Sequence, residues 1–233
     1  MSTVLHFTSL WQVADPSALR SLGQKEERRL GRHFIAECLT STMRVRAHLL
    51  LGEPAEAAEV VRSLEEQIAS GPFSMLNHCL NGGKVFLALD RGAFEEALEL
   101  STVHLRQARA AGVPLVGMIR MWWVEGVLEA HLGRMEERPY SWWEARRVKA
   151  LAHDLANSPF FGPRCLGHRG LALVYLHLGQ EKAARQAARE ALHASSSHAN
   201  AQQRLLCLET AKRLGVMPMD LDEELVELRG RSG

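Results

Sequence analysis

Several signals that would identify a membrane or secreted protein are missing from this chain. It has no run of roughly 18 apolar residues, so no segment predicts a membrane span. Met1 to Asp15 contains neither Lys nor Arg and no sustained apolar core, which argues against a secretory signal peptide. The formal net charge is only +1, so no global field favours nucleic acid or an anionic membrane. We therefore expect a cytoplasmic protein that binds neither.

Cysteine is sparse, and its spacing excludes the usual zinc and redox motifs. The four cysteines form no C-x-x-C pair. Cys38 and Cys79 are 41 residues apart, and Cys165 and Cys207 are 42 apart. Free cysteine is among the most buried residue types, so we predict small thiols at equivalent packing positions.

Catalytic motifs are also absent. The 11 histidines include no H-E-x-x-H pair, and the chain has no G-x-S-x-G, P-loop or G-x-G-x-x-G motif. Each of these chemistries needs a particular constellation of residues. We expect no enzyme activity, no cofactor and no metal.

The chain instead contains a regular spacing of glycines. Gly52, Gly92, Gly133 and Gly179 each follow an apolar stretch, at intervals of 40, 41 and 46 residues. Turn-forming residues recur on nearly the same spacing, at Gly71-Pro72, Gly112-Val113-Pro114 and Asn157-Ser158-Pro159. Self-similarity at roughly 20–50 residues is typical of stacked repeat architectures.

Ala, Leu, Glu and Arg are abundant and strand signals are few, so the chain predicts an all-α fold. Each glycine is expected to end the first helix of a pair. The first helices are predicted at 33–51, 75–91, 115–132, 163–178 and 198–214. The second helices are predicted at 54–70, 93–111, 140–156, 180–195 and 221–229.

Small residues at fixed places resemble the tetratricopeptide repeat (TPR) superfamily. Gly126 and Ala172 match its small position in the first helix, and Ala57, Ala97 and Ala184 match the alanine five places after the turn glycine. The period of 40–46 exceeds the family's usual length of about 34 and is similar to long-period repeats of bacterial signalling proteins. The resemblance implies a right-handed α-solenoid of antiparallel helix pairs, used for scaffolding, sensing or autoinhibition.

This interpretation divides the chain into three segments. Residues 1–32 are expected to form an N-terminal flanking helical segment, and residues 33–215 a TPR-like array of about four helix pairs. Residues 216–233 are expected to form a C-terminal capping helix and tail, because a solenoid needs a polar outer face.

The resemblance also implies a concave groove lined by the first helices, in which a protein or peptide partner binds. Counting back from each glycine places arginines and aromatic residues on that surface, and the irregular third unit adds Trp143. The candidate partner-binding residues are Arg46, Phe86, Arg120, Trp123, Arg169 and Trp143. Arginine can bind carboxylates or phosphates through two hydrogen bonds, and tryptophan is enriched at interfaces.

Two alternatives to a scaffold remain open at this point. The first is a regulatory module of a bacterial signalling system whose groove takes a small-molecule ligand. The second is an enzyme with a site near Trp122, His131 and Trp143, which would require a deep pocket with convergent polar groups.

Overall fold

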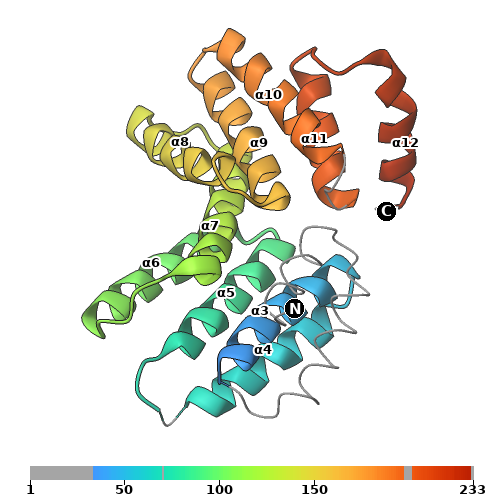
Figure 1. Ribbon diagram of the computed structural model, residues 1–233. Coiled ribbons are helices and arrows are strands. Elements are labelled where there is room, and N and C mark those ends of the chain that lie inside the picture. Colours follow the sequence, from blue (N-terminus) through green and yellow to red (C-terminus); the bar gives the residue numbers. More distant parts are fainter. Residues whose placement is uncertain (1–33, 70, 197–200, 232–233) are drawn as a thin grey trace. The chain divides into compact units, whose positions relative to one another are not determined.

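The computed structural model describes residues 34–69, 71–196 and 201–231, and these residues are almost entirely helical (Figure 1). The all-α prediction is confirmed for this part of the chain. The flanking segment predicted over residues 1–32 lies outside it. Among the described residues, no helix combines the length and the apolar character needed to cross a bilayer.

The described residues divide by their internal contacts into two units, 34–134 and 135–231. The helices of the first unit are α3 (Phe34–Leu50), α4 (Pro54–Ile68), α5 (Met75–Asp90), α6 (Phe94–Ala110) and most of α7 (Gly117–Glu137). Those of the second unit are α8 (Trp142–Ala156), α9 (Phe161–His177), α10 (Glu181–Ser195), α11 (Ala201–Arg213), a 3-10 turn η1 (Met219–Leu221) and α12 (Asp222–Arg231).

Glycines end several helices in the predicted way. Gly92 after α5 and Gly179 after α9 have φ values of 69° and 70°, a region in which a side chain would be strained. The amide of the following residue then bonds back into the last turn, at 2.8 Å from Ala93 N to Ala88 O. Gly133 is different, because α7 continues past it to Glu137. The prediction that Gly133 ends its helix is therefore wrong.

Helix–helix packing in the first unit depends on small residues. α3 contacts α4 and α5, and α5 also contacts α4 and α6. A Cβ on Gly126 would lie 3.0 Å from Val85 Cγ1, so the missing side chain brings α7 close to α5. Gly133 leaves room in the same way for the ring of Phe94. The core between these helices includes Val85, Ala88, Ala97 and Ala130.

The second unit is centred on α9, which contacts α8, α10 and α11, while α11 contacts α12. Cys165 of α9 and Cys207 of α11 share a buried cluster with Ala191 and Ala194 of α10. The prediction of buried thiols is confirmed for Cys79, Cys165 and Cys207, which are 0–1% exposed. The side chain of Cys38 lies outside the described residues.

Candidate functional site

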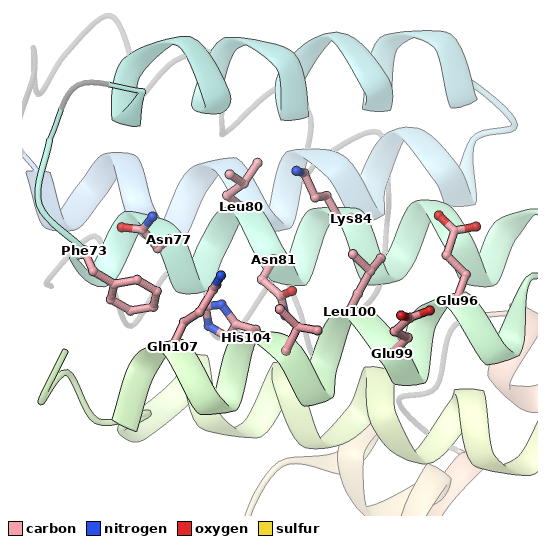
Figure 2. Close-up of a pocket in the computed structure, with 11 residues that line it drawn as sticks. Phe73, Asn77, Leu80, Asn81, Lys84, Glu96, Glu99, Leu100, His104 and Gln107 are labelled. Carbon is pink, nitrogen blue, oxygen red and sulfur yellow. The ribbon is translucent and has the colours of Figure 1, made fainter. Parts of the chain in front are cut away.

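A groove of about 350 Å³ lies between α5 and α6 in the first unit (Figure 2). Its lining side chains recur three or four residues apart along both helices, the spacing at which residues share one helix face. Four are apolar or aromatic: Phe73, Leu80, Leu100 and Val103. The others are polar: Asn77, Asn81, Gln107, His104, Lys84, Glu96 and Glu99.

The two ends of this α5/α6 groove differ in chemistry. Phe73, Gln107 and His104 lie at one end, and Glu96 and Glu99 lie at the other (Figure 2). Glu96 pairs with Arg91 at 3.0 Å, whereas Glu99 forms no ion pair with any described residue. Lys84 pairs with Glu65 of α4. Glu99 is thus the carboxylate of this end that no cation of the described residues neutralises, and we refer to the end at Glu96 and Glu99 as the acidic end.

A pair of buried histidines, His78 and His104, lies at the end of the groove opposite the acidic end. Nδ1 of His78 lies 2.7 Å from Nε2 of His104, so one ring donates an N–H to the other. Phe73 covers both rings at centroid distances of 5.6 and 5.5 Å. Burial, with a smaller effect of His78, lowers the pKa of His104 to about 4. Burial also lowers the pKa of His78. Both rings are therefore neutral near pH 7.

Asn81 lies in the middle of the groove. Its side chain is 7% exposed, and its Nδ2 is buried without a hydrogen-bond acceptor among the described residues. Most buried polar atoms in native proteins have a partner, so such an atom needs an explanation. By contrast, Oδ1 of Asn77 accepts a hydrogen bond of 2.7 Å from the backbone of Ser74, which caps α5.

Two of the candidate residues lie in the interior. Arg46 and Phe86 are only 7% and 4% exposed, so the expectation that they line an open surface is wrong. Arg46 Nη1 lies 2.9 Å from Glu125 Oε2, and the guanidinium lies 4.9 Å from the Phe86 ring centroid. Burial raises the pKa of Glu125 to about 7, and Arg46 opposes this rise. The physical reason is the direct packing of α3, α5 and α7, which covers the face that the sequence predicted to be free.

The other four candidates are at least partly accessible. Arg120 is exposed on α7, and Trp123 of the same helix is half-buried. Arg169 of α9 is also half-buried. Trp143, the second residue of α8, has 74% of its surface exposed, and its ring is nearly perpendicular to that of Trp142, with the centroids 4.6 Å apart. Their role in partner binding stays a prediction.

The groove residues themselves were not among the sequence candidates. One signal was present: Phe73 follows the turn residues Gly71-Pro72, and Phe160 follows Ser158-Pro159 in the same way, 87 residues later. Gly92 and Gly179, which end α5 and α9, are also 87 residues apart (179 − 92). Because both pairs of residues are 87 apart, Phe160 lies as far before Gly179 at the end of α9 as Phe73 lies before Gly92 at the end of α5.

A second groove occupies the equivalent place in the second unit. It has a volume of about 500 Å³ and lies between α9 and α10. Adding 87 to five positions of the α5/α6 groove gives five positions of this α9/α10 groove. The matched pairs are Asn77 with Arg164, Asn81 with His168, Glu99 with Gln186, Val103 with Glu190, and Gln107 with Ala194.

Comparisons with protein-family models, with curated proteins and with solved structures found no match to this chain. The fold and the sites thus define an all-α protein with two inter-helix grooves among its described residues. In that part of the chain, no three His, Cys, Asp or Glu side chains converge as metal ligands would.

Proposed function

We propose that this protein is a protein-interaction scaffold, built as a right-handed α-solenoid of antiparallel TPR-like helix pairs. The observation that carries the proposal is the α5/α6 groove, with an apolar middle, amide groups beside it and an acidic end. A partner segment binds along this groove rather than at the face formed by Arg46 and Phe86.

The chemistry of the groove defines the segment that fits. Leu80, Leu100 and Val103 provide apolar surface for side chains spaced i, i+3 or i+4, as on one face of an amphipathic helix. Glu96 and Glu99 favour a Lys or Arg at one end of that segment. We therefore infer an amphipathic, basic segment of a partner protein.

The recurrence of the groove supports the repeat architecture. In two helix pairs 87 positions apart, a left-handed glycine ends the first helix, and the pairs carry grooves at matching positions. In a repeat array, each unit presents the same surface, and its side chains differ from unit to unit.

Selection from a random peptide library displayed on phage, with the full chain as bait, tests the proposal. Enriched peptides should carry apolar residues three or four apart and a basic residue near one end. Their affinity should fall about tenfold or more in Val103→Glu, because a charge would then face their apolar side chains. Glu99→Gln should weaken them by no more than about fivefold, since an exposed ion pair contributes at most about 1 kcal/mol.

Val226→Glu is the control, because Val226 is another surface valine, on α12 and outside the groove; it is 69% exposed, against 37% for Val103. Equal binding of the selected peptides to wild type, Val103→Glu and Val226→Glu would refute the groove as the site. A failure to enrich any peptide would also count against a segment-binding function.

A small-molecule ligand is the second candidate, because the groove volume of about 350 Å³ lies within the range of ligand pockets. A thermal-shift screen with a metabolite collection separates the two candidates. A ligand that raises the melting temperature of wild type but not of Val103→Glu, with no peptide enriched, would favour sensing over scaffolding.

A further inference from the structure

The α9/α10 groove of the second unit carries chemistry opposite to that of the α5/α6 groove. Four of its eight lining residues are Arg or His: Arg164, His168, Arg189 and His193. In the equivalent α5/α6 groove, Arg164 and His168 are replaced by the neutral Asn77 and Asn81. The acidic Glu99 is replaced here by the neutral Gln186. The matched positions thus gain an arginine and a histidine and lose the carboxylate of Glu99, while Glu190 takes the place of Val103.

The single carboxylate in this groove is already engaged. Oε2 of Glu190 lies 3.0 Å from Nδ1 of His168, and its Oε1 accepts a hydrogen bond of 3.0 Å from Gln186 Nε2. One oxygen of Glu190 therefore accepts a hydrogen bond within the groove, and the other lies close to His168. Burial lowers the pKa of His168, and Glu190 opposes that effect.

The two arginines of the groove differ in their contacts. Arg189 forms no ion pair with any described residue, although it lies only one position from Glu190. Arg164 Nε donates to the carbonyl of Ser158 at 3.0 Å, which orients its guanidinium beside the groove. A guanidinium of this kind binds an oxyanion through two parallel N–H···O bonds.

We propose that the α9/α10 groove binds a phosphoryl group, presented either by a phosphorylated side chain or by a small phosphate ester. A phosphoryl group carries three acceptor oxygens and a charge of about −1.5 to −2 at pH 7. Arg164 and Arg189 supply the charge, and the exposed imidazole of His193 supplies a further donor. This site is independent of the partner segment proposed for the α5/α6 groove.

Calorimetric titration of the full chain tests the proposal with four probes at matched ionic strength. These are inorganic phosphate, O-phosphoserine, a seven-residue phosphoserine peptide flanked by Ala and Gly, and the same peptide with serine. Binding of at least one phosphorylated probe with a Kd of about 1 mM or tighter is expected, and the serine peptide should not bind. Preference for the peptide indicates a phosphorylated side chain, and preference for phosphoserine indicates a small ester.

Two variants assign the binding to the groove. Arg189→Gln should weaken the phosphorylated probes about tenfold or more, because it removes a charge-assisted hydrogen-bonding group. Arg185→Gln is the matched control, since Arg185 is exposed on the same helix but pairs with Glu181 outside the groove. Undetectable binding of every phosphorylated probe, or equal weakening by the two variants, would overturn the proposal. So would equal binding of the serine peptide.

Discussion

Replacing Gly167 with alanine should separate two helices of the second unit. Gly167 lies in α9, directly against the last turn of α8. A Cβ at this position would lie 2.2 Å from the backbone nitrogen of Ala156 and 2.7 Å from its Cα. These are backbone atoms, so no side-chain rotation can remove the overlap, and α8 must move away by about 1 Å or more to restore ordinary contact distances.

The expected cost follows from two opposing effects. Overfilling a packed interior costs about 1–3 kcal/mol, and a rigid backbone obstacle belongs at the upper end of that range. Alanine is a better helix former than glycine by about 1 kcal/mol, which offsets part of the cost. We expect Gly167→Ala to lower the free energy of unfolding by about 2 kcal/mol. For a chain of this length, the melting temperature should fall by roughly 4–8 °C.

Gly82→Ala is the matched control, because Gly82 is also a helical glycine, in α5, and a Cβ there would make an ordinary contact of 3.6 Å with Thr42. This variant should gain up to about 1 kcal/mol from helix propensity alone. Urea denaturation followed by circular dichroism measures both variants. If Gly167→Ala were as stable as wild type, or were stabilised like Gly82→Ala, the close approach of α8 and α9 would be wrong.

Three further predictions concern buried polar groups. The pKa of His104 is about 4 in the folded chain, against an ordinary value of 6.5. The unfolded chain therefore binds the proton first, and the free energy of unfolding should fall by roughly 1–2 kcal/mol from pH 7 to pH 4. His104→Gln should reduce that loss in urea titrations across this range, and an unchanged pH profile would argue against a buried neutral ring. Asn81→Leu removes the buried N–H donor that lacks an acceptor, so the free energy of unfolding of this variant, measured by urea denaturation, should equal that of wild type or exceed it by up to about 1 kcal/mol. A decrease of more than about 1 kcal/mol would show that the amide has a hydrogen-bond partner. Cys79, Cys165 and Cys207 should be alkylated only after unfolding, as mapped by mass spectrometry, and rapid labelling of any one in the native protein would contradict its burial.

The helices could be predicted well because their ends are local features of the sequence. The range 75–91 was expected and α5 covers Met75–Asp90; the range 180–195 was expected and α10 covers Glu181–Ser195. A glycine that follows the last turn with a positive φ, such as Gly92, ends its helix through local backbone geometry. Gly133 shows the limit of this rule, because its missing side chain serves close packing against Phe94 instead of a turn.

The exposed faces of those helices could not be predicted in the same way. Counting from a glycine gives the position of Arg46 or Phe86 around its helix, but not which neighbouring helix covers that face. The packing of α3, α5 and α7 against one another covers that face, and it buries Arg46 against Glu125. The groove residues come together only because α6 packs beside α5, which the sequence of either helix does not state. The 87-residue spacing of Phe73 and Phe160 was the one signal of this site in the sequence.

Chemical-shift mapping tests the proposed partner site most directly. A peptide selected against the full chain is added to ¹⁵N-labelled protein, and amide shifts are followed by nuclear magnetic resonance. We expect the largest shifts at the α5/α6 groove, on residues such as Asn81 and Leu100, and smaller shifts in Val103→Glu at the same peptide concentration. Largest shifts on Arg120, Trp123 or Trp143, with those groove amides unmoved, would contradict the proposed site.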